Sequence, residues 1–566
     1  MANEIQGNGQ QPDGEERSQT KGQGQASSPA PAPGPNGQGA STSTSSSSSS
    51  PPPPPPPPPQ PSSRAPGAKP VIRLIDGELP TTVDKAEQAL LGAATRYFYQ
   101  RSTQIVRPIK SRARAAGGRW TYSWRLEVVT KPHMVETLTR VAQFEQWSRA
   151  GKGYVVVNCP EQIAEVYLAR VGRWKLPSLF SVVNAPFLRI DGTPRETPGY
   201  DSENGLLYIP ETAFPPIPTN PSKLDALAAL SRIIKKLLSE FPFVDLVDRS
   251  VFLSALLTAF DRHAMATAPL HGFTAPSAGT GKSLLVDLIS LLLSGRAAPV
   301  TAQGGNPEET EKRIASALLV SDRIISLDNC SRVVDGGDLL CQMLTQEMVN
   351  IRLLGHSRNI EVPMTSTVFA TGNNLIVTDD LTRRTLLCRL DAGVERPELR
   401  TFKSNVLKVA RAERVGLVID VLTILRAWHL SGEPESDNPL GSFEEWSFRV
   451  RQPLLWLDQV DPCSSIGLVR ENDPARTALD IVLQQWATTL GTMNALTVQE
   501  IISRAVVVPD LYNALMTVAA ATQGLTISND RLGRWLSKNN GKIVGRFRLT
   551  RAGITMGYPR WRVDRV

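Results

Sequence analysis

Cysteine and histidine are scarce in this chain, whose 566 residues contain five of each. No two cysteines have CxxC spacing, and no histidines form an HExxH pair. These absences argue against a disulfide scaffold and against a zinc site, and they suit a reducing cytosol. The five cysteines are Cys159, Cys330, Cys341, Cys388 and Cys463.

Long apolar runs are absent as well. No stretch is long enough to span a bilayer, and the N-terminus lacks the apolar core of a signal peptide. We therefore expect a soluble intracellular protein without membrane contact. The net charge of +8 is a mild basic excess, which is compatible with a polyanionic partner without proving one.

The length predicts about three or four domains. Residues 1–70 are rich in Gly, Gln, Ser and Pro, and the proline run Pro51–Pro59 is typical of a stiff polyproline section. We interpret them as a disordered tail that acts as a tether or, alternatively, docks a partner that recognises polyproline. The remaining parts are predicted to be an α+β domain (71–218), an α/β domain with a parallel sheet (219–432), a linker or insert (433–465) and a small C-terminal domain (466–566).

The 71–218 region mixes helical and extended patterns. Its expected helices are Thr82–Ala94, Met134–Ala150 and Pro160–Gly172, and its expected strands include Tyr97–Pro108 and Trp120–Thr130. A basic group lies between these two strands and is followed by two tryptophans. It could track a nucleic-acid backbone with stacking aromatics, or equally be a solvated loop beside core tryptophans. The group consists of Lys110, Arg112, Arg114 and Arg119, with Trp120 and Trp124.

The stretch Pro276–Ser283 has the pattern of a phosphate-binding loop. A candidate strand, Leu270–Thr274, precedes it, and a candidate helix, Leu284–Leu293, follows it. In this context backbone N–H groups would cradle phosphates, a lysine would reach the β and γ oxygens, and a serine hydroxyl would ligate Mg²⁺. The predicted ATP-binding residues are Ser277, Ala278, Gly279, Thr280, Gly281, Lys282 and Ser283, although Pro276 stands where the usual pattern has its first glycine.

Two later strands are expected to end in polar residues beside this loop. The strand Arg323–Asn329 delivers Asp328, a candidate to hold Mg²⁺ together with Ser283. Asn329 stands where a glutamate usually polarises the attacking water, so hydrolysis would need another acid, water oriented by amides, or a slow rate. The strand Thr365–Thr371 leads to Asn373, our first choice to position water, with Asn374 second.

A β-hairpin is expected between those strands, from Val349–Leu354 and Asn359–Pro363. Its tip carries His356 and Arg358, which could grip a DNA backbone inside a ring, or alternatively face solvent. Arg383 and Arg384 follow the next strand and are candidate arginine fingers acting across a subunit boundary. We rank Arg384 first and expect Arg389 to pair with Asp391 instead; a plain surface pair is the alternative for Arg383 and Arg384.

The C-terminal domain is predicted to have three helices, Val498–Ala505, Pro509–Ala521 and Asn529–Asn539, and a β-ribbon, which suggests a winged helix. Its basic residues include Arg534, Arg546 and Arg548. Such a face suits DNA phosphates, with protein contact as the alternative.

These motifs together resemble the AAA+ ATPases, and among them the superfamily 3-like primase-helicase proteins of phages and mobile elements. The resemblance rests on Gly279–Ser283, Leu327–Asn329, Gly355–Arg358 and Ala370–Asn374, and it is supported by 363–402 and 191–200. It implies a P-loop core, a hexameric ring, ATP hydrolysis with Mg²⁺ at subunit interfaces, and movement along single-stranded or forked DNA.

We therefore interpret the chain as an ATP-dependent DNA helicase acting in replication, with replication proteins as possible partners, in the cytoplasm of a bacterial host. Two alternatives stay open. One is an ATP-gated scaffold or loader that hydrolyses little, which Asn329 favours. The other is an AAA+ regulator, which the hairpin fits poorly.

Overall fold

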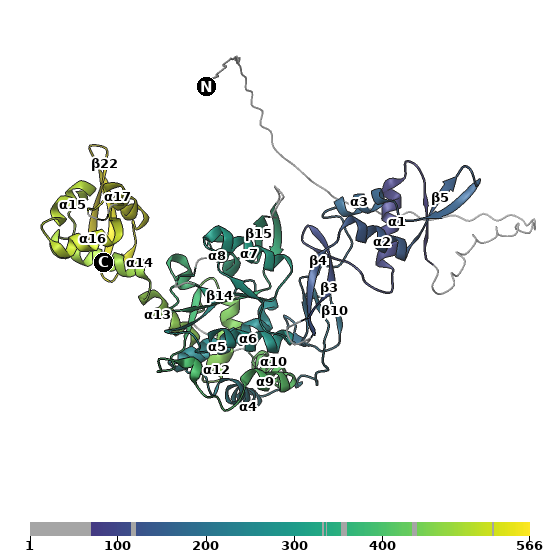
Figure 1. Cartoon of the computed structure of the whole chain (residues 1–566), viewed down its shortest axis with the longest axis horizontal. Helices are drawn as coiled ribbons and strands as arrows, with labels where there is room; N and C mark the ends of the chain where they lie inside the picture. The colour runs from purple at the N-terminus through teal and green to yellow at the C-terminus, as the bar shows by residue number, and fades with distance from the viewer. Residues whose placement is uncertain are drawn as a thin grey trace, which may run out of the picture. The chain divides into compact units, whose positions relative to one another are not determined.

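The computed structural model describes residues 69–114, 120–330, 333–334, 337–352, 359–432, 438–522, 524 and 526–566 (Figure 1). The tail predicted for 1–70 lies almost wholly outside the described residues and stays a prediction. No helix among the residues that the structure describes is long and apolar enough to cross a membrane.

A five-stranded parallel sheet forms the centre of the 219–432 region. Its strand order is β13-β14-β17-β12-β18, so β17 lies between β12 and β14. This order confirms the expected α/β class with a parallel sheet. The strands are β12 (Leu270–Ala275), β13 (Val300–Ala302), β14 (Ile324–Cys330), β17 (Thr367–Asn373) and β18 (Thr385–Arg389).

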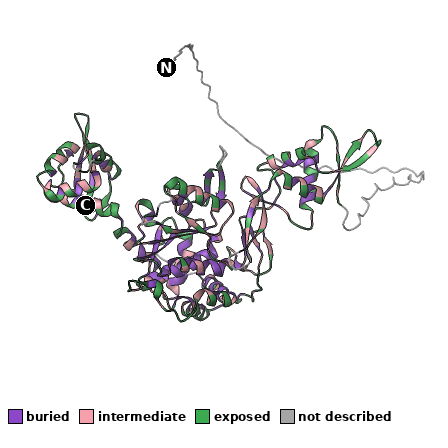
Figure 2. Cartoon of the chain, in the orientation of Figure 1, coloured by how far each residue is buried: buried purple, intermediate pink, exposed green. Residues whose placement is uncertain are grey.

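Helices surround the sheet and close one large apolar core, drawn purple in Figure 2. Helix α5 is buried along nearly its whole length, and Asp245 and Asp248 form a capping box at its start, which satisfies otherwise orphaned N–H groups. The helices here are α4 (Lys223–Ile233), α5 (Leu246–Asp261), α6 (Lys282–Ser294), α7 (Pro307–Leu319), α8 (Gly337–Thr345), α9 (Val406–Ala412) and α10 (Arg414–Leu430).

The core extends beyond the expected 219–432 limits. Ala185 and Leu188, from the region assigned to the preceding domain, pack into it, and so do Phe443 and Trp446 from the tract interpreted as a linker or insert. That tract contains α11 (Glu444–Trp446) and α12 (Gln452–Trp456), and α13 (Ser465–Glu471) follows it. The buried tryptophan donates its indole N–H to Thr258 Oγ1 at 2.8 Å, which anchors the tract to α5.

His271 lies inside this core, in the middle of the sheet, and is fully buried. Ser254 Oγ donates to Val251 O, so the His271 Nε2–H must donate to Ser254 Oγ, 3.1 Å away. The other ring nitrogen has no hydrogen-bond partner among the described residues. Burial lowers the pKa of His271 to about 3, because a charged imidazolium would lose its hydration.

This burial predicts acid-sensitive stability. The unfolded chain binds the proton near the ordinary pKa of 6.5, whereas the folded chain does not, so His271 stabilises the fold above pH 6.5 and loses that contribution as the pH falls toward about 3. Between pH 7 and pH 5 the loss should be about 2 kcal/mol. Urea unfolding of the wild type and His271→Gln at both pH values should show a smaller pH effect in the variant; an equal effect would contradict the prediction.

The 71–218 region begins with a helical and sheet unit. Helices α1 (Leu79–Leu91) and α3 (Glu161–Ala169) and strand β4 (Trp120–Val128) agree with the sequence-based elements. The single strand expected over Tyr97–Pro108 is wrong, because the chain turns there and forms two antiparallel strands, β2 (Tyr99–Arg101) and β3 (Gln104–Arg114). Strand β3 includes positions 110, 112 and 114 of the basic group, which therefore do not lie in a loop. Short strands follow, namely β7 (Ser181–Val183), β8 (Phe187–Leu188), β9 (Pro194–Arg195), β10 (Gly199–Asp201) and β11 (Leu206–Tyr208).

One predicted helix here is wrong over half its length. Helix α2 (Lys131–Val141) ends early, and β5 (Gln143–Ser148) replaces the rest of Met134–Ala150. Strand β5 pairs in parallel with β1 (Val71–Leu74) and antiparallel with β6 (Gly153–Val157). Phe144 is fully buried by this pairing. Long-range sheet contacts therefore override the local helical pattern.

The expected hairpin is present between α8 and β17. Strands β15 (Met348–Arg352) and β16 (Asn359–Pro363) pair antiparallel, with Ile351 opposite Ile360. One face is buried against the main core and the other is exposed. Its predicted tip residues, His356 and Arg358, lie outside the described residues.

The C-terminal region has an apolar core of its own. Helix α14 (Pro474–Thr489) leads to α15 (Val498–Ala505), α16 (Pro509–Ala519) and α17 (Asn529–Lys538), close to the predicted bounds. The sheet order is β19-β22-β21-β20, with β21 and β22 forming the predicted ribbon. Its strands are β19 (Leu496–Thr497), β20 (Ile543–Val544), β21 (Phe547–Thr555) and β22 (Tyr558–Arg565).

Candidate functional site

The loop between β12 and α6 is shaped by two glycines. Gly279 and Gly281 have φ values of +77° and +103°, a region that side chains with a Cβ rarely adopt. Space excludes a Cβ as well, since one at Gly279 would lie 2.9 Å from the Glu398 backbone nitrogen and one at Gly281 would lie 3.0 Å from the Phe241 ring. The loop thereby turns the chain directly from a buried strand into the first turn of a helix, where N–H groups lack intrahelical acceptors.

Lys282 is the first residue of α6 and is 9% exposed. Its ammonium donates to Ser277 O at 2.9 Å and to Thr280 Oγ1 at 3.3 Å. Burial lowers the pKa of Lys282, and the nearby charge of Asp328 partly opposes this shift. A buried ammonium held against the loop can stabilise an anion there strongly, because little water competes for it.

Ser283, Asp328 and Thr371 come together from α6, β14 and β17. The Ser283 hydroxyl donates to Asp328 Oδ1 at 2.6 Å, and the Thr371 hydroxyl donates to the same oxygen at 2.5 Å. Thr371 Oγ1 also accepts the Asn329 N–H at 3.1 Å. Ser283 and Asp328, which the sequence assigned to one Mg²⁺ site, are thus close in space. Thr371 was missed: it ends the strand expected over Thr365–Thr371, and the prediction chose Asn373 and Asn374 after it instead.

The backbone at Asn329 explains why a glutamate is absent there. The register of β14 against β17 shifts between Leu327 and Cys330, and Asn329 has a φ of +54°. Asparagine tolerates this left-handed conformation far better than glutamate does. The same bulge is what turns the Asn329 N–H toward Thr371.

Asn373 ends β17 and is paired with Ala275, the last residue of β12. The buried Asn373 Oδ1 has no hydrogen-bond partner among the described residues. Asn374, the second choice, instead has a φ of +47° and donates its N–H to Ala275 O at 2.9 Å. Because β17 lies between β12 and β14, the Asn373 side chain ends between the glycine loop and Asp328 at the carboxyl edge of the sheet.

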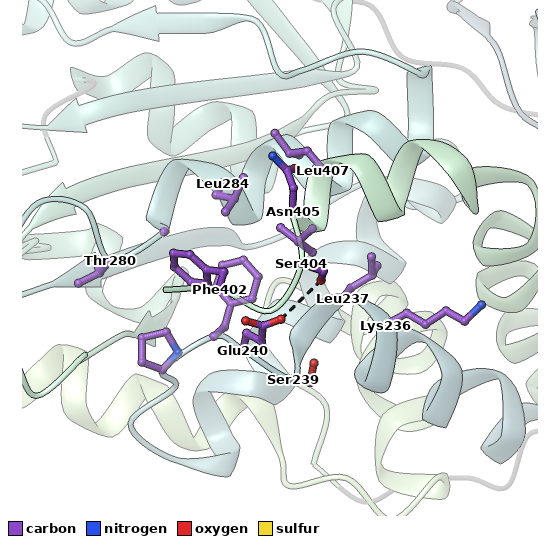
Figure 3. Close-up of a pocket in the computed structure, with 14 residues that line it drawn as sticks. Lys236, Leu237, Ser239, Glu240, Thr280, Leu284, Phe402, Ser404, Asn405 and Leu407 are labelled. Atoms are coloured by element: carbon purple, nitrogen blue, oxygen red, sulfur yellow. Dashed lines mark hydrogen bonds between the residues drawn. The ribbon is translucent and has the colours of Figure 1, made fainter. Parts of the chain in front are cut away.

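A pocket of about 390 Å³ adjoins the glycine loop, and sequence reasoning did not find it. Thr280 and Leu284 form one part of its wall, while Phe241, Phe402 and Leu407 give it apolar surface. Figure 3 shows Thr280, Leu284, Phe402 and Glu240 converging from separate parts of the chain. Glu240 fixes the 402–407 segment by accepting the Lys403 N–H at 2.8 Å. The lining residues extend from Lys236 to Leu407, 171 positions apart, so no local motif could signal them.

The candidate arginine fingers lie at the opposite edge of the sheet. Leu270, the first residue of β12, donates its N–H to Arg384 O at 2.9 Å. Strand β12 rises about 17 Å over the five residue steps from Leu270 to Ala275, and this distance separates the two arginines from the glycine loop that follows Ala275. Arg384 is 12% exposed at its side chain and bonds Asp380 and Cys341 O, whereas Arg383 is 49% exposed.

Arg389 corrects one expectation. It pairs with Asp248, not with Asp391, through Nη2 to Oδ2 at 3.1 Å. Asp248 is fully buried and also accepts the Arg389 backbone N–H at 2.7 Å, so the arginine ties β18 to the start of α5. Asp391 instead accepts the Gly393 N–H within its own turn.

The predicted DNA contacts of the C-terminal region are exposed. Arg534 lies on α17, Arg546 in the β20–β21 turn and Arg548 on β21. Arg534 Nε donates to Asp530 O at 3.3 Å within its own helix, while Arg560 donates to Ala495 O at 3.0 Å and Arg531 to Ala520 O at 2.7 Å. The exposure of the three predicted residues is compatible with an external partner, and their contact with DNA stays a prediction.

The basic group of the 71–218 region is described in part. Lys110 lies 5.9 Å above the ring of Trp124, its cross-strand neighbour, and that ring is partly buried against a small apolar cluster. Arg119 lies outside the described residues, as do the side chains of Arg112, Arg114 and Trp120. The described residues thus favour the alternative in which Trp124 packs in the local core over the one in which it stacks on nucleic-acid bases.

The donor set fits a nucleotide with Mg²⁺ better than a metal held by protein alone. Among the described residues, no group of three or more His, Cys, Asp or Glu side chains could hold a metal ion. Ser283 and Asp328 supply one hydroxyl and one carboxylate, which suits Mg²⁺ because it usually completes its shell with water and phosphate oxygens.

No family model and no curated protein matches this chain. Among solved structures it is similar to an apo form of the C-terminal region of NrS-1, with a TM-score of 0.36 and 11% identity over 82% of this chain and 96% of that one. A second is SCCmec type IV Cch, described as an active helicase, with a TM-score of 0.32 and 13% identity over 84% of this chain and 98% of that one. Similarity this low carries no argument about function, which depends on the site itself.

Proposed function

We propose that the chain is an ATP-dependent DNA helicase of a phage or integrated mobile element, acting in DNA replication. The observation that carries the proposal is the cluster of Ser283, Asp328 and Thr371 beside the glycine loop, at the carboxyl edge of a parallel sheet. This edge is where open α/β sheets bind their ligands.

Each residue then has a role in ATP hydrolysis. The loop Ser277–Gly281 surrounds the phosphates, Lys282 neutralises the β and γ oxygens, and the apolar pocket lined by Phe241 and Phe402 takes the nucleoside. Bound Mg²⁺ would neutralise phosphate charge as it develops, and Ser283 and Asp328 would hold it. Asn373 has an unpartnered amide oxygen that can accept a hydrogen bond from the attacking water.

Coupling to DNA would come from outside this cluster. His356 and Arg358, which lie between β15 and β16 in the sequence, would contact single-stranded DNA in the channel of a homo-oligomeric ring, and Arg534, Arg546 and Arg548 would hold duplex or forked DNA. Arg383 completes the active site of the neighbouring subunit, since neither it nor Arg384 can reach the loop of its own chain across the sheet. The greater exposure of Arg383 reverses our sequence-based ranking.

A second candidate is an ATP-gated DNA scaffold or loader. The bulge at Asn329 favours it, because the position that usually carries the water-polarising glutamate has a left-handed backbone here. In that case ATP would bind and order the ring, and turnover would be slow. An AAA+ regulator is a third reading, and the hairpin between β14 and β17 argues against it.

Strand displacement on forked DNA tests the proposal, with wild type, Lys282→Ala and His356→Ala compared. We expect unwinding to disappear in both variants, because one lacks the phosphate contact and the other the DNA grip, while His356→Ala keeps its ATPase activity. Lys85→Ala, on the exposed surface of α1, is a surface control that should unwind normally. Wild-type protein without ATPase activity, even with DNA, would favour the scaffold.

A further inference from the structure

The three-stranded sheet β1-β5-β6 has one face that no described residue covers. Its inner face carries Ile72 and Phe144, which are buried among α1, α2 and α3. On the outer face, Trp147, Tyr154 and Val156 are 53%, 41% and 66% exposed. Figure 2 shows the β5–β6 hairpin coloured almost entirely as exposed or intermediate.

The two aromatic side chains of this outer face contact each other edge to face. Trp147 and Tyr154 are direct cross-strand neighbours, with ring centroids 5.3 Å apart and planes at 78°. The guanidinium of Arg73 lies 4.5 Å above the Tyr154 ring. Arg73 also pairs with Glu145 at 3.3 Å, which neutralises the acidic side chain of this face. The result is an exposed edge-to-face aromatic pair, in which Arg73 covers one face of Tyr154 and Trp147 stays exposed.

The turn that joins the two strands adds positive charge. Arg149 and Lys152 are exposed, and neither forms an ion pair with a described residue. Gly151 N–H donates to Ser148 Oγ at 3.1 Å, which shapes the turn. Lys152 has a φ of +47°, a backbone conformation that glycine adopts far more readily. A lysine kept in a strained position is better explained by its charged side chain than by the turn.

We propose that this face binds single-stranded nucleic acid, with a base stacked on Trp147 and phosphates contacting Arg149 and Lys152. Exposed aromatics beside unpaired cations form the usual platform for single strands, since every base offers a π face. A duplex hides its base faces, so it would gain only the phosphate contacts. A protein strand could pair with the edge of β6, but that would leave the two cations of the turn without partners. The site lies outside the ATPase cluster and does not depend on it.

The test of the site is the affinity of the full chain for a fluorescent oligo-dT of about 15 nucleotides, measured by fluorescence anisotropy without added ATP. Trp147→Leu should weaken binding roughly tenfold, because it keeps apolar bulk but removes the stacking ring, whereas Trp147→Phe should keep most of the affinity. The double variant Arg149→Gln, Lys152→Gly should bind several-fold more weakly and with a shallower salt dependence.

The double variant also shows whether a loss of affinity could come from misfolding. Lys152→Gly relieves the left-handed backbone, so its thermal midpoint should not fall. Leu224→Ala, on the exposed surface of α4, is a distant control that should leave the affinity unchanged. If Trp147→Leu and the double variant both bind oligo-dT within about twofold of wild type, the proposal is overturned and a protein partner becomes the occupant of this face.

Discussion

Replacing Asp328 by asparagine should lower the ATPase rate on the order of 10²- to 10³-fold, the usual cost of losing one preorganised charged group in an active site. The substitution keeps the size of the side chain and an oxygen that can still accept from Ser283 and Thr371. It removes the negative charge that would hold Mg²⁺. Steady-state ATP hydrolysis across a Mg²⁺ series measures the effect, and the half-saturating Mg²⁺ concentration should rise as the rate falls.

Asp287 offers a matched control for this result. It lies one turn into α6, close enough to Asp328 for that charge to contribute to raising its pKa, although burial is the larger cause. Its carboxylate accepts the Ala298 N–H at 3.0 Å, which an asparagine oxygen can also do. Asp287→Asn should therefore leave the rate within about twofold. An equal loss in both variants would mean that Asp328 acts through general electrostatics or stability, and not by holding a metal.

Two variants of Thr371 test whether this residue acts by positioning the Asp328 carboxylate, as distinct from binding the metal itself. Thr371→Val keeps the shape of the side chain but leaves Asp328 with one fewer donor and the Asn329 N–H without its acceptor. Thr371→Ser retains both bonds. Within the same Mg²⁺ series, the serine variant should therefore behave like wild type.

Local patterns in the sequence were sufficient to locate the strands and the helix that hold the candidate site residues. A buried strand, a glycine turn and an apolar helix specify Lys282 and Ser283 almost without reference to the rest of the chain, and the ends of two further apolar strands point to Asp328 and Asn373. Parallel strands bring their carboxyl ends to one edge, so the clustering follows from the strand assignment itself.

Features that depend on distant contacts were missed. The pocket beside the glycine loop joins Phe241 to Phe402, and neither residue lies in a recognisable pattern. The residues of β5 were predicted to be the end of a helix, because their pairing with β1 is a long-range contact that the local pattern does not show. Arg389 was assigned to the nearest acid in sequence, whereas the fully buried Asp248 needs a cation and takes it from a strand 141 residues away.

Arg383→Ala should lower the ATPase rate on the order of 10³-fold without weakening nucleotide binding, because a finger acts on charge that develops in the transition state. Its side chain is half exposed and, among the described residues, bonds only Asp380 within its own turn, so the fold should tolerate the loss. Arg384→Ala should instead lower the melting temperature, since Arg384 also bonds Cys341 O across to α8.

Mixing two inactive variants distinguishes action in trans from action in cis. In a ring built from equal amounts of Arg383→Ala and Lys282→Ala subunits, about one quarter of the interfaces combine an intact loop with an intact arginine from its neighbour. ATP hydrolysis should therefore recover to roughly that fraction of the wild-type rate, although each variant alone is inactive. The separation of Arg383 from its own loop, across the whole length of β12, requires this recovery. A mixture that stays inactive, despite forming rings of normal size, would remove Arg383 from the active site and leave hydrolysis to the residues of a single subunit.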